Sequence, residues 1–285
     1  MKTPKGLQPL IDDGIIDAVM RPLKSGKEAS VYVVRRGEEV LCAKVYKDVD
    51  QRSFQNRVVY QEGRKTRGSR QARAMKKATK FGRKEQEAAW KSTESDTLYT
   101  LADAGVCVPR PHGYFHGVLL MELVTDESGH SAQLLGEVDL TAQEACDFHA
   151  CLMSDIVRML CLGMIHGDLS EYNVLLAASG PVIIDFPQVV SASGNNAARS
   201  MLLRDVHNIR DCLARFSPEL KETYFGEEMW ALYEQGNLKA DSVLTGMFDF
   251  DQTTADVDAV LLTIEDARQE AIIRQLGRVE AAEND

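Results

Sequence analysis

Two short segments in the second half of the chain place oxygen-bearing side chains at spacings that suit phosphate chemistry. Residues 166–173 read His-Gly-Asp-Leu-Ser-Glu-Tyr-Asn, and Asp185 ends an apolar run that begins at Val182. Asp168 can orient a hydroxyl group and accept its proton, while Asn173 and Asp185 offer the hard oxygen ligands that Mg²⁺ prefers. This combination is typical of enzymes that transfer the γ-phosphate of ATP.

The residues around these segments predict a rigid support for the metal ligands. Val174-Leu175-Leu176 and Val182-Ile183-Ile184 are apolar runs on either side of a turn at residues 178–181, which predicts a β-hairpin. Asp and Asn also cluster at turns for backbone reasons alone. The complete pattern, HGD-x-x-x-x-N followed by an apolar run that ends in Asp, is much rarer than a lone D-x-x-x-x-N.

A second group of residues near the N-terminus suits phosphate binding. A turn at Ser25-Gly26-Lys27 precedes the apolar run at residues 31–34, and residues 40–46 predict a second strand. Small residues at such a turn let backbone N–H groups approach phosphate oxygens. Lys44 lies mid-strand among apolar residues, where an unpaired ammonium group is costly, so we expect it to contact a phosphate and a carboxylate. The Gly-Lys pair does not complete a Walker A motif, because Arg and Glu stand where that motif requires Gly and Ser or Thr.

Composition limits the class of protein. The 285 residues are 44% hydrophobic and 27% charged, which predicts a soluble globular protein of one or two domains. The sequence shows neither an apolar run of about 18 residues nor a secretory signal, so we expect a cytoplasmic protein with no membrane partner. The six cysteines form no C-x-x-C pair and lie mostly among apolar neighbours, which predicts reduced, buried thiols rather than disulfides or zinc ligands.

Charge is unevenly distributed along the chain. Residues 52–91, here called the basic segment, contain 13 Lys/Arg and 3 Asp/Glu, a charge of about +10, against about −20 for the remaining residues. Such polarity favours a polyanionic partner, either RNA or a ribosomal particle, although a solvated helix face would also account for it.

Hydrophobic periodicity predicts the other elements that position these residues. In chain order we expect a helix from Trp90 to about Gly105, strands at residues 106–109 and 118–121, a helix from the capping box at Thr141 and Glu144 to Gly163, a helix from Arg204, and an amphipathic helix at residues 256–276.

Over residues 12–216 the chain resembles the RIO family of atypical protein kinases. Five segments support the resemblance: Ser25–Ala29, Ala43–Lys47, His166–Asn173, Ile184–Gln188 and Arg204–Ile209. Ser-Gly-Lys-Glu-Ala and Leu-Ser-Glu-Tyr-Asn are similar to one subfamily, and Ile-Asp-Phe-Pro-Gln to another. The chain is therefore identified as a prokaryotic RIO-type serine/threonine kinase with mixed subfamily motifs.

The resemblance implies an α+β, two-lobed protein-kinase-like fold. It implies a small β-rich N-lobe at residues 1–121, which includes a flexible insert at about residues 50–90, and a short helical C-lobe at residues 122–216. Residues 217–285 would form a C-terminal helical extension outside the shared core.

The resemblance also implies a site that uses ATP with Mg²⁺ or Mn²⁺ to phosphorylate an unidentified protein substrate, or to hydrolyse ATP. The implied roles are a phosphate-binding loop containing Ser25 and Lys27, an α/β-phosphate contact from Lys44 paired with Glu94, hinge backbone groups for adenine at Glu122 and Val124, a catalytic base at Asp168, and metal ligands at Asn173 and Asp185. Asp185 would in addition be a transient phosphate acceptor.

Two alternatives remain compatible with the sequence. Small-molecule phosphotransferases of the aminoglycoside or choline kinase kind share HGD-x-x-x-x-N and a metal-binding Asp, but they usually have an extended acidic region after the metal loop. Here some 20 residues separate Asp185 from the next predicted helix. An RNA- or ribosome-associated assembly factor that uses ATP as a switch would also suit the basic segment.

Overall fold

The computed structural model describes residues 3–26, 29–47 and 94–250. The chain divides into two compact units, Met1–Gly246 and Met247–Asp285, and all the elements below belong to the first. Lys27, the basic segment and the helix predicted at residues 256–276 lie outside the described residues.

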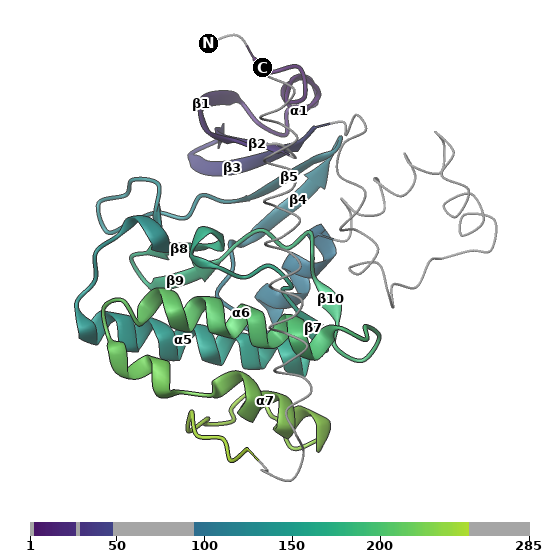
Figure 1. Ribbon diagram of the computed structural model, residues 1–285. Helices are drawn as coiled ribbons and strands as arrows, with labels where there is room; N and C mark the ends of the chain where they lie inside the picture. The colour runs from purple at the N-terminus through teal and green to yellow at the C-terminus, as the bar shows by residue number, and fades with distance from the viewer. Residues whose placement is uncertain (1–2, 27–28, 48–93, 251–285) are drawn as a thin grey trace, which may run out of the picture. The chain divides into compact units, whose positions relative to one another are not determined.

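A five-stranded antiparallel sheet forms the N-lobe, in the order β1-β2-β3-β5-β4 (Figure 1). Its strands are β1 (Ala18–Ser25), β2 (Ala29–Arg36), β3 (Glu39–Tyr46), β4 (Pro111–Phe115) and β5 (Val118–Glu122). A short helix, α1 (Gln8–Asp12), precedes the sheet, and Leu7 and Leu10 pack with Leu41 and Leu120 in an apolar cluster. Burial of these side chains fixes the register of β3, the strand that contains Lys44.

The prediction of a strand at residues 106–109 is wrong. The backbone of Cys107 in this segment forms hydrogen bonds with residues of the C-lobe instead. Cys107 N–H donates to Asp155 Oδ2 at 3.2 Å, and Ile183 N–H donates to the Cys107 carbonyl at 2.8 Å. The strand lies instead at β4, which begins with Pro111 and contains Gly113. Edge strands tolerate Pro at their start and Gly at a bulge, and β4 has both, with a register shift between Pro111 and Gly113.

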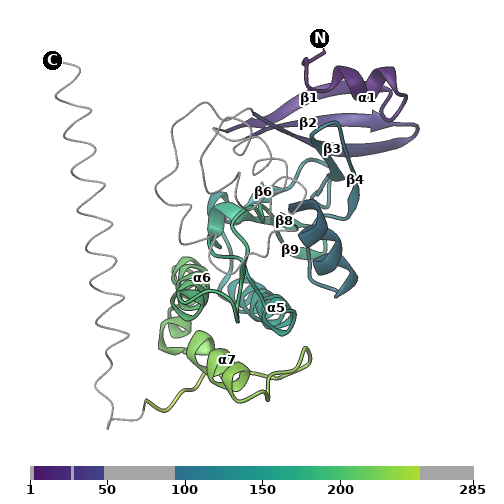
Figure 2. The ribbon, with the colours of Figure 1, turned by 90° about the vertical axis from the view of Figure 1, so that its right-hand side faces the viewer.

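The C-lobe contains the long helices α5 (Ala142–Cys161) and α6 (Ala198–Leu213), which lie side by side in Figures 1 and 2. The predicted capping box is confirmed: Glu144 N–H donates to Thr141 Oγ1 at 3.2 Å, and Thr141 N–H donates to Glu144 Oε2 at 2.8 Å. Gly163, with φ of 72°, follows the end of α5 as predicted. The start predicted for α6 at Arg204 is wrong, because the chain already turns at Asn195, whose Oδ1 accepts from Ala197 N–H at 2.8 Å.

The C-lobe also contains two small sheets. The predicted hairpin is confirmed as β8 (Val174–Ala177) and β9 (Gly180–Ile183), extended by β6 (Gln133–Leu134). The short 3₁₀ helix η1 (Leu135–Glu137) follows β6, and η2 (Glu171–Asn173) precedes β8. A separate ladder pairs β7 (Met164–Ile165) with β10 (Val190–Ser191).

Residues 217–246 belong to the same compact unit as α5 and α6. They contain the 3₁₀ helix η3 (Pro218–Glu222) and α7 (Phe225–Glu234). Leu220, Met229 and Trp230 are buried in the core cluster that α5 and α6 share. The Glu228 carboxylate accepts hydrogen bonds from the backbone N–H groups of Thr245 and Gly246, at 2.9 and 2.7 Å respectively, and so secures the segment after α7.

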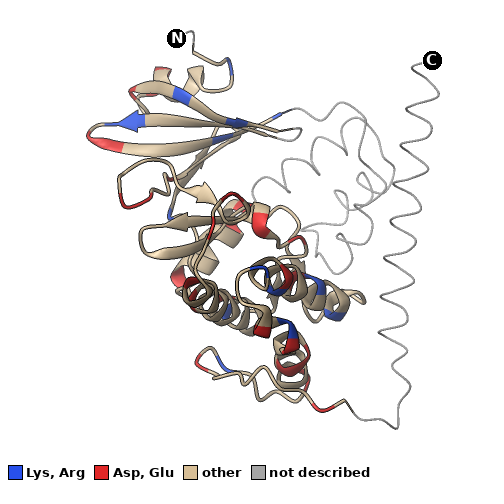
Figure 3. Cartoon of the chain, turned by 60° about the vertical axis from the view of Figure 1, so that its left-hand side comes forward, with Lys and Arg blue, Asp and Glu red and all other residues tan. Residues whose placement is uncertain are grey.

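The prediction of buried thiols is correct for Cys42 and Cys212 and wrong for Cys107, Cys151 and Cys161, which are exposed. Cys151 and Cys161 have apolar neighbours in sequence, but their positions on α5 fall on its outer face. Basic and acidic residues both occur along the helices of the C-lobe (Figure 3). No helix in the described part of the chain is both long and apolar enough to cross a membrane.

A buried histidine makes the stability of the C-lobe depend on pH. His149 of α5 is 2% exposed, and its ring lies 5.1 Å from that of Phe225 in α7. Burial, assisted by Arg210, lowers the pKa of His149 from 6.5 to about 4. The unfolded chain therefore binds this proton first as the pH falls. We expect the contribution of His149 to the free energy of unfolding to fall by up to about 3 kcal/mol between pH 6.5 and 4.

Urea unfolding at pH 7 and pH 4.5 tests this contribution in wild type and in His149→Gln. On going from pH 7 to pH 4.5, we expect the free energy of unfolding of wild type to change in the destabilising direction relative to that of the variant. Equal differences would show that His149 does not cause the pH dependence.

Candidate active site

Lys44 forms the centre of the site and binds two carboxylates that come from different parts of the chain. Its Nζ lies 2.6 Å from Glu94 Oε1, which confirms the predicted ion pair with the helix that includes residues 94–103, and 2.5 Å from Asp185 Oδ1. Tyr46, two residues along β3, donates its hydroxyl to Glu94 Oε2 at 2.5 Å. The Glu94 side chain is 4% exposed, and the ion pair and the Tyr46 bond therefore compensate a charge that burial alone would disfavour.

The charges in this cluster stabilise each other. Burial acts to lower the pKa of Lys44, but Glu94 and Asp185 outweigh it, so the pKa is raised and the side chain remains an ammonium. Burial acts to raise the pKa of Asp185, and the Lys44 charge and hydrogen bond outweigh that effect, so the pKa is lowered. Asp185 is therefore a carboxylate at neutral pH, with its side chain 46% exposed.

The hairpin brings Asn173 and Asp185 to the same end of the C-lobe sheet. Val174 of β8 pairs with Ile183 of β9, and Ile184 N–H donates to the Asn173 carbonyl at 2.9 Å. Asn173 Nδ2 donates to the Asp168 carbonyl at 2.7 Å, which orients the amide and leaves Oδ1 as its ligand atom. Asp185 has φ of 70°, in the left-handed region that non-glycine residues seldom adopt.

These two side chains fit a magnesium ion that also binds nucleotide. Within the described residues, no group of three or more His, Cys, Asp or Glu side chains is arranged so that it could hold a metal ion. Mg²⁺ does not need such a cage, because it keeps several waters and binds through one or two protein oxygens plus substrate phosphates. One ionised carboxylate and one oriented amide oxygen match that requirement.

Helix α6 holds the segment that contains Asp168. The Asp205 carboxylate accepts from the N–H groups of Gly167 and Leu169 at 2.7 and 2.9 Å. Arg204 donates to the Gly167 carbonyl at 2.5 Å, and Asn208 Nδ2 donates to the Leu169 carbonyl at 2.9 Å. Backbone groups on both sides of Asp168 are thus fixed by one helix face.

The Arg-Asp-x-x-Asn motif at residues 204–208 was predicted only as a family match. Its bonds to the backbone on both sides of Asp168 were not predicted from the sequence. Asp205 is 1% exposed, and burial raises its pKa to about 7 against the effect of its two N–H donors. The spacing of these residues could have indicated a shared role, because Asn208 follows Asp205 by three residues and Arg204 by four, and residues at these separations share a helix face. A buried Asp in that position needs partners that only the folded chain provides.

Asp168 is suited to accept a proton. Burial raises the pKa of its carboxyl group, Arg204 opposes this shift, and the negative charge of Asp185 adds to it. A raised pKa makes the carboxylate a stronger base than an ordinary aspartate.

The predicted phosphate loop and hinge are described in part. Ser25 Oγ lies 3.1 Å from Ser30 Oγ, and Lys47 Nζ donates to Ser25 Oγ at 3.1 Å and to the Gly26 carbonyl at 2.6 Å. Lys47 therefore closes the turn between β1 and β2, a contact that sequence reasoning did not assign.

At the predicted hinge, Glu122 ends β5, whose residue Leu119 pairs with Lys44. The Glu122 Oε2 atom accepts from Arg110 N–H at 3.1 Å, and the Val124 carbonyl accepts from Ala132 N–H at 2.9 Å. Lys44 and Glu122 therefore belong to one sheet, and Val124 lies two residues beyond its end.

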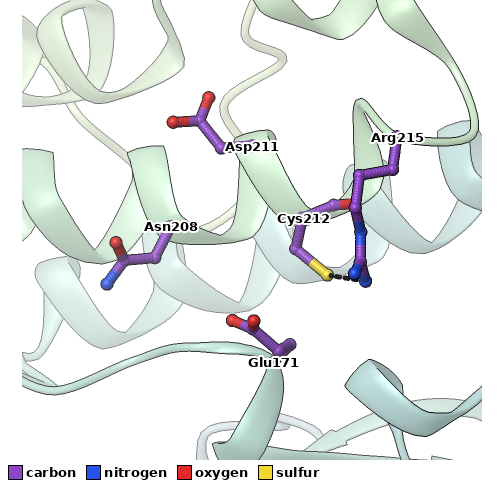
Figure 4. Close-up of a pocket in the computed structure, with 5 residues that line it drawn as sticks. All are labelled: Glu171, Asn208, Asp211, Cys212 and Arg215. Atoms are coloured by element: carbon purple, nitrogen blue, oxygen red, sulfur yellow. Dashed lines mark hydrogen bonds between the residues drawn. The ribbon is translucent and has the colours of Figure 1, made fainter.

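A cavity of about 290 Å³ lies between η2, which follows the segment that contains Asp168, and α6. Figure 4 shows its lining, which consists of Glu171 from η2 and Asn208, Asp211, Cys212 and Arg215 from α6 and the residues after it. Arg215 donates to Cys212 Sγ at 3.2 Å. Asn208 also supports the Leu169 carbonyl, so this wall of the cavity positions the segment that contains Asp168.

Comparison with known proteins shows which family the chain is similar to. The family model described as the RIO domain matches residues 30–225. The RIO-type serine/threonine-protein kinase Rio1 of Haloferax volcanii is 30% identical over 213 residues, covering 72% of this chain and 67% of that protein. The serine/threonine-protein kinase RIO1 of Chaetomium thermophilum is 30% identical over 224 residues, covering 72% of this chain and 41% of that protein.

Similarity extends to a relative named rio2. The serine/threonine-protein kinase rio2 of Schizosaccharomyces pombe is 32% identical over 177 residues, covering 60% of this chain and 45% of that protein. The chain thus spans less than half the length of two of these three relatives. The matched region contains Lys44, Glu94, Asp168, Asn173 and Asp185, and the chain belongs to the RIO family.

Proposed function

We propose that the protein is an ATP-dependent serine/threonine kinase of the RIO type, with ATP hydrolysis as the reaction when water takes the place of the acceptor. The observation that supports this most directly is the position of Lys44 between Glu94 and Asp185, at 2.6 and 2.5 Å. An ammonium group held this way can exchange a carboxylate contact for phosphate oxygens. Membership of a family whose relatives are named as kinases supports the same reaction.

The reaction assigns one task to each side chain. Lys44 binds the α- and β-phosphates, and Glu94 keeps it directed toward them. Asn173 and Asp185 would hold Mg²⁺, which neutralises phosphate charge when bound. The acceptor hydroxyl oxygen bonds to the γ-phosphorus as the bond to the β,γ-bridging oxygen breaks, and Asp168 takes the hydroxyl proton. Ser25 and Lys27 cover the phosphates, and the backbone of Glu122 and Val124 binds adenine.

We further propose that the protein is cytoplasmic, that its unidentified substrate is a protein, and that the basic segment binds a polyanionic partner, RNA or a ribosomal particle. The charge of about +10 in residues 52–91 supports this partner, since phosphate contacts draw on Lys and Arg.

A small-molecule phosphotransferase is less well supported. Because α6 begins at Ala198, residues 186–197 form the whole connection after Asp185, which is shorter than the sequence suggested. That leaves less chain for the acidic substrate region that such enzymes usually contain.

Incubation with γ-labelled ATP and Mg²⁺ tests the proposal under four conditions: a generic protein acceptor, an RNA-containing extract, a panel of aminoglycosides and choline, and no acceptor. We expect label on protein, free phosphate without acceptor, and neither after chelation with EDTA. Label that is lost in base and in hydroxylamine would identify a transient acyl phosphate on Asp185. Label on the small molecules alone would contradict the kinase assignment and favour the alternative.

A further inference from the structure

The ladder between β7 and β10 places Gln188 beside the catalytic segment. Val190 of β10 pairs with Ile165 of β7 in antiparallel register. In this register, the residues that precede Val190 lie opposite the residues that follow Ile165. In this position Gln188 Nε2 donates to Asp168 Oδ2 at 3.3 Å.

Gln188 extends from a well-anchored segment. Phe186 and Val189, on either side of it, are 3% and 8% exposed, and Val189 N–H donates to the Phe186 carbonyl at 3.4 Å. The Phe186 ring lies 5.2 Å from the buried ring of His166. The backbone that presents Gln188 is thus fixed to the same core as the segment that presents Asp168.

The Asp168 backbone and side chain are held from different directions. Asp205 fixes the flanking N–H groups and Asn173 holds the Asp168 carbonyl, but neither bond restrains rotation of the carboxylate. The Gln188 bond acts on the carboxylate itself, because it engages Oδ2 and leaves Oδ1 available to an acceptor. Rotation of a terminal carboxylate is otherwise broad.

We propose that Gln188 is a positioning residue for phosphoryl transfer, which orients the Asp168 carboxylate so that Oδ1 receives the acceptor proton. The inference rests on the proposed kinase function. In the transfer step the acceptor O–H bond breaks, its proton goes to Asp168 Oδ1, and its electron pair forms the new O–P bond while the β,γ-bridging oxygen leaves. Gln188 keeps both amide protons throughout and acts only through Asp168.

Two substitutions separate hydrogen bonding from packing. Gln188→Ala removes the amide, and Gln188→Glu keeps the shape but replaces the donor with a second carboxylate. We expect both to lower kcat, Gln188→Ala by about 10-fold, while KM for ATP and the thermal midpoint stay unchanged, because misalignment of a base affects the transfer step rather than nucleotide binding. Gln143→Ala is the matched control, since Gln143 Nε2 makes the same kind of bond to Asp147 Oδ1, at 2.9 Å, on the surface of α5.

The deciding measurement is a double-mutant cycle with Asp168→Asn, read from the residual rate of γ-phosphate release and transfer. We expect Gln188→Ala to cost less than twofold once Asp168 is replaced, because its only path to the reaction is gone. A full 10-fold loss in that background, or wild-type kcat in Gln188→Glu, would overturn the role of Gln188 alone. Absence of any γ-phosphate release or transfer by the wild-type protein would instead refute the proposed function, and the orienting role with it.

Discussion

Asp168→Asn is expected to lower kcat by about 10²- to 10⁴-fold, the range that a positioned general base contributes. The amide is nearly isosteric with the carboxylate but cannot accept the hydroxyl proton. Nucleotide affinity should remain within twofold of wild type, because Lys44, Asn173 and Asp185 are unchanged and Asp205 still fixes the backbone of the segment.

Single-turnover transfer from γ-labelled ATP measures the chemical step, and calorimetric titration with MgADP measures binding. Asp147→Asn on the surface of α5 is the control for the same chemical change outside the site. Near wild-type turnover in Asp168→Asn would show that Asp168 is not the base.

Lys44→Met is expected to abolish turnover at ordinary ATP concentrations and to lower the free energy of unfolding by about 3–5 kcal/mol. The substitution removes the phosphate contact and leaves Glu94, with a side chain only 4% exposed, without its counter-charge. Glu94→Gln should also weaken ATP binding, because Lys44 would then be directed by Asp185 alone. The two losses in ATP affinity should not add, since each substitution breaks the same pair.

A double-mutant cycle read by both ATP titration and urea unfolding tests this coupling. Arg36 and Glu39 provide a control pair, with Nη2 and Oε2 2.7 Å apart on the surface of the β2–β3 hairpin. We expect much smaller effects there, because solvent screens exposed ion pairs. Additive losses at Lys44 and Glu94 would speak against direct coupling in the nucleotide complex.

Most of the candidate site could be predicted because its chemistry lies in short contiguous motifs. Asp168 and Asn173 are five residues apart, and the apolar runs that position Asp185 read directly as a hairpin. The Lys44–Glu94 pair was predictable for a different reason: an ammonium group in an apolar strand requires a carboxylate, and the next helix supplies one.

The contacts that sequence reasoning missed depend on packing between distant segments. Asp205 binds the backbone 38 and 36 residues away, and Gln188 reaches Asp168 only through the register of β7 and β10. The strand predicted at residues 106–109 failed for a related reason. Side-chain periodicity does not reveal that the Cys107 backbone is bonded to Asp155 and Ile183.

The backbone conformation of Asp185 lowers the stability of the fold at a position where the side chain contributes to the candidate site. Glycine adopts a φ of 70° without penalty, whereas for aspartate this conformation costs on the order of 1 kcal/mol. A glycine would therefore be the better residue for folding and would leave Lys44 with one carboxylate instead of two. The aspartate at this position is explained by the contact that its carboxylate makes with Lys44. The ion pairs of Lys44 with Asp185 and Glu94 offset the cost of the strained backbone conformation.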